Sequence, residues 1–522
     1  AFVDDQVQRL VDAVGDSPTL WVIVGDHGEA LGDHNQIYHG LYIYNDTQRV
    51  PWILSGAGIE PAVVDQPVGL ADLLPTVLNR LDIPVPKGLD GAVQPGQPRP
   101  LAMETWELRS KYGYAPHTGL VDGRWKYIAT PKPELYDQLG DVDEVNNLAE
   151  EEAGIVMELA RKLTELEIPV YEANPTSGMN AETLSRLAAL GYVSGGGQAV
   201  TEDAPDPKDR QKVLIHLQTA SEARKARRNK LAIKNYEEAI ALDPSLVLPR
   251  AKLAFLLHQE GRVGEGLVWS ESALEMNPQS FDVVLVAIML REATKDPEGS
   301  WDLCEDLLEL QAHSTHAAEA CMTVLFNQGR SEEALQLGKD FLETHPEANN
   351  VSAFLGVYLA SVARFEEARP FLEVGLESSF PRRTLRQHLA MMALALENRG
   401  QAMALLREEL VDFPGNYRAR ESLVRLLDKD SRHDEQLEQL DILLADFPTS
   451  VRYMHARAEV LFDMGDLEGS ALGLEAAFAI EPEDADLVLL LANLLMAQGQ
   501  EEEGRATFER AKRLKAAESS KD

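Results

Sequence analysis

The stretch LPRAKLAFLLHQEGRVGEGLVWSESALEMNP (residues 248–278) decides most of the fold. Its apolar residues recur with helical spacing on both sides of Gly261, which separates two halves of similar length. Small residues such as Ala254 and Ala273 allow two helices to cross closely, and the neighbouring leucines fill the space between them. Pro278 ends the second half, because proline cannot continue a helix. The stretch therefore predicts a pair of packed antiparallel helices.

The same pattern recurs through the rest of the chain. Helix-ending prolines stand 34 residues apart or twice that, with one interval of 35 and one of 33, at Pro244, Pro278, Pro346, Pro381, Pro414, Pro448 and Pro482. This period is typical of tetratricopeptide repeats, in which neighbouring helix pairs bury each other's apolar faces. We expect about nine repeats over residues 213–518, forming a right-handed all-α solenoid with a concave binding face.

The N-terminal third has a different pattern, in which short apolar runs alternate with helical stretches. This alternation predicts an α/β region over residues 1–172, with a mixed sheet and flanking helices over residues 1 to about 150. The continuously apolar run 20–24 predicts a strand that is buried on both faces. The remaining expected elements are a strand at 50–54, a helix at 70–81, a hairpin or meander over 119–128 and 134–136, and a helix at 150–166.

A segment rich in glycine, proline and serine separates the two patterns. It contains Asn174-Pro175, a Gly-Gly-Gly run at 195–197 and an Asp-Pro step at 206–207, with a short helical piece at 184–190. Such a composition is typical of a linker. The predicted domains are therefore an α/β region at 1–172, a linker with a short helix at 173–212 and the repeat array at 213–518.

Composition excludes some partners. The formal net charge of −37 repels phosphate backbones, so nucleic acid is not an expected partner. No apolar run approaches the roughly 20 residues that span a bilayer. Cys304 and Cys321 form no C-x-x-C motif, and we expect both to be small core residues on repeat helices.

Candidate chemistry lies directly after the predicted strand 20–24, in the stretch GDHGEALGDH (residues 25–34). Asp26 and His27 offer a carboxylate and an imidazole at a strand end, where α/β folds place ligands, and the two can bind one divalent cation. Taken alone, these residues also suit a turn with a solvated carboxylate. His39 follows in a Tyr-His-Gly step.

In its context this stretch resembles the sulfatase branch of the alkaline phosphatase superfamily, whose chains carry a helix, a strand and then an S/G-D-H/N-G-E-x-L-G-x-H motif. Further similar blocks follow in the same order, at residues 39–40, 49–51, 72–76, 88–91, 124–128, 134–137 and 147–148. The resemblance covers some 150 residues, with residues 3–10 as the expected first helix. Residues 184–193 also resemble the linker of sulfatases that carry such repeats.

The resemblance implies roles for individual residues. Asp26 and His27 match half of the family's metal site, which suits Ca²⁺ first, while the imidazole also suits Mn²⁺ or Zn²⁺. His39 falls where the family places a side chain against the sulfate oxygens, and it is the expected catalytic residue, although a structural loop histidine is the alternative. We expect a supporting or structural role for His34 and assign none to His117.

The family's nucleophile is a formylglycine made from Cys or Ser within C/S-x-P-x-R, or a Thr or Ser in the phosphatase branches, and we expect it upstream of this chain together with two aspartate ligands. The string SFPRR (residues 379–383) matches the motif, but we reject it, because Pro381 is a repeat-boundary proline and the string follows the metal motif instead of preceding it. We therefore interpret the chain as the C-terminal part of a sulfatase and expect this part alone to be inactive.

The leading hypothesis is thus a metal-dependent hydrolase of sulfate esters, acting on an anionic small molecule or glycan, with repeats that bind a protein or peptide. One alternative is a phosphodiester or phosphonate hydrolase or a phospho-headgroup transferase of the same superfamily. Another is a non-catalytic repeat scaffold. The resemblance also suggests a periplasmic, extracellular or membrane-associated location in a bacterium.

Overall fold

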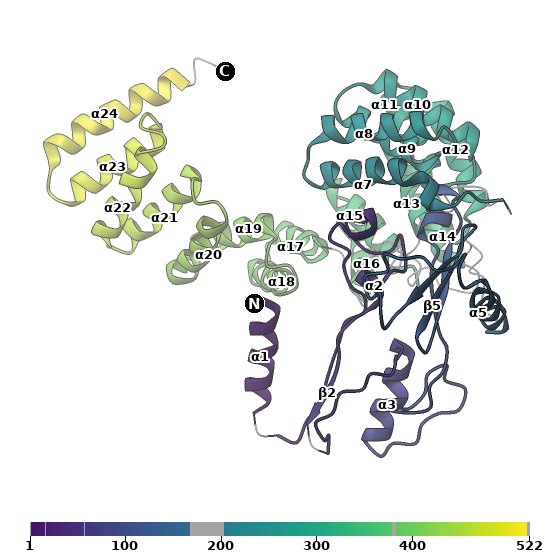
Figure 1. Cartoon of the computed structure of the whole chain (residues 1–522). Helices are drawn as coiled ribbons and strands as arrows, with labels where there is room; N and C mark the ends of the chain where they lie inside the picture. The colour runs from purple at the N-terminus through teal and green to yellow at the C-terminus, as the bar shows by residue number, and fades with distance from the viewer. Residues whose placement is uncertain (1, 16, 57, 167–202, 378–382, 519–522) are drawn as a thin grey trace. The chain divides into compact units, whose positions relative to one another are not determined.

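The structure is a computed structural model that describes residues 2–15, 17–56, 58–166, 203–377 and 383–518 (Figure 1). It divides into two compact units, Ala1–Ser331 and Glu332–Asp522. The helix predicted at 184–190 lies outside the described residues, and so does most of the string 379–383. The domain boundaries predicted at residues 172 and 212 stay predictions, because most of the segment between them is not described.

The fold class is confirmed: a small α/β region is followed by a long series of helices. Within the described ranges, all strands precede residue 209. The predicted mixed sheet is wrong, because the strands form two separate antiparallel sheets, β1-β2 and β3-β4-β5-β6. Short connections join β4 to β5 and β5 to β6. They are too short for the crossover that parallel pairing requires, so these strands must pair antiparallel.

The first sheet is a two-stranded ribbon of β1 (Leu20–Val24) and β2 (Trp52–Gly56). The strand predicted at 50–54 thus begins two residues later. The prediction that 20–24 is buried on both faces is wrong, because all five residues of β1 are only half-buried. Among the described strands, β1 pairs only with β2, and this two-stranded ribbon lacks the covering layers that bury the strands of larger sheets.

Helices precede and follow the two strands of this ribbon in the sequence. The expected first helix is α1 (Phe2–Val14), and the helix predicted at 70–81 is present as a 3₁₀ turn, η2 (Leu70–Asp72), followed by α3 (Leu73–Arg80). The remaining elements before the second sheet are η1 (Asp33–Asn35) and α2 (Asn45–Gln48).

The second sheet consists of β3 (Leu101–Thr105), β4 (His117–Asp122), β5 (Trp125–Ala129) and β6 (Glu134–Asp137), with α4 (Glu107–Tyr112) between the first two strands. Its register pairs Leu120 with Tyr127 and Tyr127 with Leu135, so these three side chains share one face. That face packs on α5 (Ala153–Glu165), the helix predicted at 150–166 (Figure 1).

The opposite face of this sheet belongs to a larger core. Ile128 and Tyr136 contact the segment 41–44, in which every residue is buried. Gly119 keeps this contact close, because a Cβ atom there would lie 2.7 Å from Ile43 Cδ1. The same cluster continues into the first repeat helices, where it includes Leu217. The α/β region and the start of the repeat array therefore share a hydrophobic core.

The repeats begin after a 3₁₀ turn, η3 (Pro207–Arg210). Eighteen helices follow in the described part of the chain, which makes nine consecutive pairs and agrees with the predicted number. They are α7 (Gln211–Lys225), α8 (Asn229–Leu242), α9 (Leu248–Gln259), α10 (Val263–Met276), α11 (Phe281–Ala293), α12 (Pro297–Leu310), α13 (Thr315–Asn327), α14 (Ser331–Thr344), α15 (Asn349–Ser361), α16 (Phe365–Leu376), α17 (Leu385–Ala395), α18 (Arg399–Asp412), α19 (Tyr417–Lys429), α20 (His433–Asp446), α21 (Val451–Asp463), α22 (Leu467–Phe478), α23 (Ala485–Ala497) and α24 (Glu501–Glu518).

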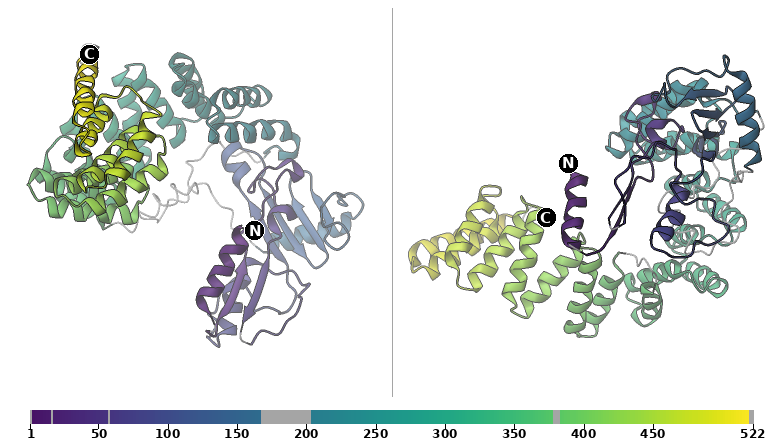
Figure 2. Two further views of the ribbon diagram at one scale, coloured as in Figure 1. Left: turned by 90° about the vertical axis from the view of Figure 1, so that its left-hand side faces the viewer. Right: turned by 60° about the horizontal axis from the view of Figure 1, so that its bottom comes forward.

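Within the second unit, the helices pack in sequence order, as the right-hand view in Figure 2 shows. Small residues permit the close crossings, as the sequence predicted. A Cβ atom on Gly356 of α15 would lie 2.7 Å from Leu372 Cγ of α16, so the two helices contact each other almost through their backbones. Cys304 and Cys321, in the first unit, are both buried free thiols on repeat helices, as expected.

The part of the chain that the structure describes contains no helix long and apolar enough to cross a bilayer.

Candidate functional site

The candidate site lies in the loop that leaves β1. The backbone N–H of Gly25 donates to the carbonyl of Pro51 at 3.2 Å, which extends the β1–β2 pairing by one residue. Asp26 and His27 come next, at the end of the strand where the sequence predicted them. The Asp26 side chain is 91% exposed and the His27 side chain 44%, so both are accessible to a ligand.

Gly28 fixes the path of this loop. Its N–H donates to the carbonyl of Thr47 at 2.7 Å. A Cβ atom at position 28 would lie 2.2 Å from the carbonyl oxygen of Asp46, closer than any side chain can approach. Only glycine therefore lets the loop lie against α2 in this way.

Hydrogen bonds orient the two predicted metal ligands. The backbone N–H of His27 donates to Asp26 Oδ1 at 3.0 Å. His27 Nδ1 lies 2.9 Å from the carbonyl of Gly28, which can only accept, so Nδ1 is a donor, and in the neutral ring Nε2 then has the lone pair. The free Nε2 lies 3.9 Å from Asp26 Oδ2.

His39 comes from eleven residues beyond Gly28, yet its ring lies directly against that of His27. The two ring centroids are 3.7 Å apart with an interplanar angle of 31°. His39 Nδ1 lies 3.3 Å from Glu29 Oε2, and both side chains remain partly exposed, at 45% and 37%. The structure thus brings the three predicted site residues together, in an accessible group with Glu29.

Glu29 was not predicted as a site residue. It belongs to the quoted motif, but nothing in the spacing of one glutamate and one histidine ten residues later indicates that their side chains meet. The contact depends on the fold of the intervening loop, which turns at Gly32 and His34, where φ is +114° and +50°.

The implied metal can be tested against these side chains. Two ligand atoms on one Zn²⁺ or Mn²⁺, each roughly 2.0–2.2 Å from the cation, can be no more than about 4.4 Å apart. The separation of 3.9 Å between His27 Nε2 and Asp26 Oδ2 fits this limit. A histidine held by a bond from its other nitrogen to a backbone carbonyl is also the usual state of a metal ligand. Asp26 and His27 therefore fit half of a site, while no group of three or more His, Cys, Asp or Glu side chains suited to a metal occurs within the described ranges.

His34 is held in the structure by its neighbours. Its Nδ1 lies 3.2 Å from Asp46 Oδ2, and its ring stacks on Tyr44 at 3.9 Å. Burial lowers the pKa of His34, but the hydrogen bond and charge of Asp46 outweigh this effect, and the net pKa is raised. These contacts are those of a structural residue that fixes the loop.

His117, to which the sequence assigned no role, is fully buried in β4 with its ring edge-on to Tyr42. Burial lowers its pKa to about 4. It lies in the core shared with the repeats and not in the exposed loop.

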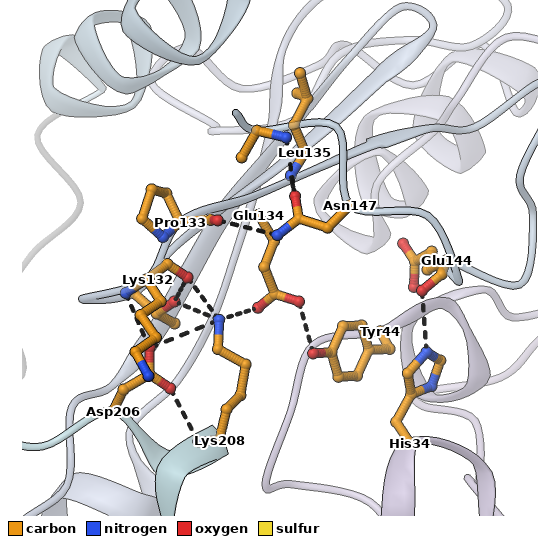
Figure 3. A network of polar contacts seen from close by, with 12 residues as sticks. His34, Tyr44, Lys132, Pro133, Glu134, Leu135, Glu144, Asn147, Asp206 and Lys208 are labelled. Carbon is orange, nitrogen blue, oxygen red and sulfur yellow. Dashed lines mark hydrogen bonds and ion pairs between the residues drawn. The ribbon is translucent and has the colours of Figure 1, made fainter. Parts of the chain in front are cut away.

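Two buried charge clusters hold Tyr44 and Asn45, which follow this loop in the sequence. Lys126 Nζ lies 2.7 Å from Glu144 Oε1, and neither side chain is exposed. In the second cluster, Lys208 Nζ donates to Glu134 Oε1 at 2.7 Å, and Glu134 Oε2 accepts from the Tyr44 hydroxyl at 2.8 Å (Figure 3).

Comparisons with known proteins agree with the resemblance. The family model described as Sulfatase matches residues 1–83, and a Tetratricopeptide repeat model matches residues 461–519. The chain is 35% identical over 163 residues to an uncharacterised sulfatase, YidJ, of Escherichia coli (strain K12), covering 29% of this chain and 32% of the relative. It is 30% identical over 167 residues to Arylsulfatase K of Homo sapiens, covering 28% and 30%. The Choline-sulfatase of Rhizobium meliloti (strain 1021) is 28% identical over 177 residues, covering 30% and 33%.

The chain thus spans about a third of the length of these curated relatives. Similar solved structures include a MamA protein, MSR-1 C2, at 17% identity with a TM-score of 0.29, covering 33% of this chain and 98% of that one. Another is a tetratricopeptide repeat protein of Parabacteroides merdae ATCC 43184, at 15% identity with a TM-score of 0.21, covering 58% and 93%. The chain therefore carries sulfatase-family sequence at its N-terminal end, followed by tetratricopeptide repeats.

Proposed function

We propose that this chain supplies part of the active site of a metal-dependent sulfatase, with Asp26 and His27 as metal ligands and His39 as the catalytic residue that contacts the sulfate oxygens. The observation that carries the proposal is the contact between the His27 and His39 rings at 3.7 Å, beside the exposed carboxylate of Asp26. The residues that the family resemblance selected thus lie together and face solvent.

Each side chain has a distinct task in this proposal. His27 presents the lone pair of Nε2, because its Nδ1 proton is held by the Gly28 carbonyl. The Glu29 carboxylate accepts from His39 Nδ1 and so orients the ring, and as an imidazolium His39 would also donate from its opposite ring nitrogen to a sulfate oxygen. When bound, a divalent cation would stabilise charge on the sulfate and activate the nucleophile. Ca²⁺ is the first candidate, and Mn²⁺ or Zn²⁺ are also compatible with an imidazole ligand.

The nucleophile is not supplied by this chain in our proposal. The curated relatives are about three times as long as the matched region, which leaves room for the formylglycine and the remaining carboxylate ligands. We propose that the chain alone is inactive, because it would lack both the covalent partner and half of the metal ligands.

The decisive experiment is an assay of the full-length encoded protein with an aryl sulfate and with a bis-aryl phosphate diester. We expect hydrolysis of the sulfate, and a loss of about 100-fold or more in kcat/KM for Asp26→Asn. The matched control is Asp33→Asn, which changes an exposed aspartate seven residues further along and should leave the rate unchanged. Preference for the phosphate diester would favour the phosphodiesterase alternative, and the absence of any hydrolysis would favour a non-catalytic scaffold.

The repeats point to a protein or peptide partner, which we place on the concave face that such arrays form. The substrate would be a sulfate ester of a small molecule or glycan. We further propose a periplasmic, extracellular or membrane-associated location, as in the expectation from the sequence.

A further inference from the structure

The loop that carries His39 is held from outside the α/β region, by the first repeat helix. The side-chain oxygen of Gln218, on α7, accepts from the backbone N–H of Ile37 at 2.8 Å. Its amide nitrogen donates to the carbonyl of Asn35 at 3.3 Å. A single side chain of α7 therefore fixes the backbone on both sides of residue 36, three residues before His39.

A second contact lies between these residues and His39. Lys225, in the last turn of α7, places its ammonium group 4.5 Å from the centre of the Tyr38 ring. Glu222, one turn earlier, holds the same ammonium at 2.9 Å. Such a cation–π contact favours one position of the ring. The residue directly before His39 is thus also oriented by α7.

The start of α7 is anchored firmly enough to act as a support. Lys208, in the turn that precedes the helix, donates to Glu134 at 2.7 Å and to the carbonyl of Lys132 at 2.6 Å (Figure 3). Asp206 accepts from the backbone N–H of Lys132 at 2.9 Å. Apolar residues of α7, including Leu217, belong to the same core as segment 41–44, which follows His39.

We propose that α7 is a built-in part of the candidate site, and that Gln218 is a positioning residue that sets the place of His39. A repeat array attached only through a flexible linker would leave the loop unchanged when α7 is altered. Here, a displacement of α7 moves the backbone at residues 35–38 and with it the His39 ring. The array is thereby mechanically connected to the site.

The test uses this chain labelled with ¹³C at histidine Cε1 and compares Gln218→Ala with Gln211→Ala. Gln211 is exposed on the first turn of α7 and provides a matched control. The two adjacent, tilted rings shift each other's resonances, so His27 and His39, assigned with His27→Asn and His39→Asn, report on their separation. We expect both resonances to move in Gln218→Ala and neither to move in Gln211→Ala. Amide exchange at Ile37 should be about tenfold faster in Gln218→Ala.

A conservative variant distinguishes positioning from general destabilisation. Gln218→Glu keeps an oxygen that accepts from Ile37 N–H but places a second acceptor oxygen against the Asn35 carbonyl, so the His39 resonance should lie between its positions in the unaltered chain and in Gln218→Ala. Unchanged histidine resonances in Gln218→Ala would overturn the inference, and so would equal changes in Gln211→Ala.

The effect of Gln218 on catalysis rests on the proposed function, but its effect on the position of the His39 ring does not. In the full-length encoded protein, Gln218→Ala should lower kcat for the aryl sulfate more than it changes KM. If the unaltered protein hydrolyses nothing, the proposed function fails while the resonances still decide the inference.

Discussion

Replacing Lys126 by methionine removes one partner of the buried ion pair that joins β5 to the loop after β6. Lys126 Nζ lies 2.7 Å from Glu144 Oε1 and 3.2 Å from the side-chain oxygen of Asn45. Burial lowers the pKa of Lys126, and the charge of Glu144 opposes this effect. In the variant, Glu144 keeps its hydrogen bonds from Asn45 N at 2.6 Å and Gln138 at 3.2 Å but loses its cation.

Leaving one charge of a buried pair without its partner costs about 3–5 kcal/mol. Since 1.36 kcal/mol corresponds to a factor of ten, local opening of the sheet should become about 10²- to 10⁴-fold more frequent. Lys126→Met combined with Glu144→Gln should recover most of this loss, because it removes both charges and keeps an acceptor for Asn45. Lys132→Met is the surface control, because the Lys132 side chain is 64% exposed and that of its partner Asp209 is 49% exposed. The loss of free energy of unfolding in this variant should stay below about 1 kcal/mol.

Hydrogen exchange measured by mass spectrometry on peptides from residues 117–137 is the appropriate assay, because a chain of several units does not unfold in one step. Faster exchange in this region, with no change in the helices of the second unit, is the expected result. Equal effects of Lys126→Met and Lys132→Met would show that the pair is not buried as described. A double variant as unstable as the single one would refute the reasoning that an unpaired charge causes the loss.

Three further predictions follow from individual residues. Burial lowers the pKa of His117 to about 4, so as pH falls below about 6.5 this histidine binds a proton in the unfolded chain before it does so in the folded one. The free energy of unfolding should therefore decrease by up to about 3 kcal/mol between pH 6.5 and pH 4. His117→Leu should remove this pH dependence, measured by hydrogen exchange in β4. Gly28→Ala should displace the loop, because its Cβ would lie 2.2 Å from a backbone oxygen, and the ring resonance of His39 should move with it. Gly356→Ala should destabilise α15 and α16 by about 1–3 kcal/mol, measured by exchange in those helices, whereas Gly415→Ala, which has open space around it, should not.

Much of the fold was predictable because its determinants are local or periodic. The 34-residue recurrence of helix-ending prolines predicted the helix pairs, and the small residues at crossings, such as Gly356, have the contacts that the pattern required. The predicted helix at 150–166 and the meander of β4 to β6 were confirmed. The burial of β1 was not predictable from its apolar run, because burial depends on which strands and helices cover it.

The site was predictable only as a set of residue types. Asp26, His27 and His39 were selected from a motif, and the structure adds that they lie together; their roles remain proposals. The contact of Glu29 with His39 and the support by Gln218 depend on long-range packing, the latter across 181 residues. No local sequence pattern indicates such a contact, because the two residues of each pair are brought together by the packing of different segments.

The most direct test of the central claim is a titration of the full-length encoded protein with Mn²⁺, observed through ¹³C-labelled histidines. Paramagnetic Mn²⁺ broadens only nearby resonances, so the account predicts selective broadening of His27 and His39, no effect on His117, and loss of the effect in Asp26→Asn. Broadening that spares His27 and His39, or that persists unchanged in Asp26→Asn, would contradict the assignment of this loop as the metal site.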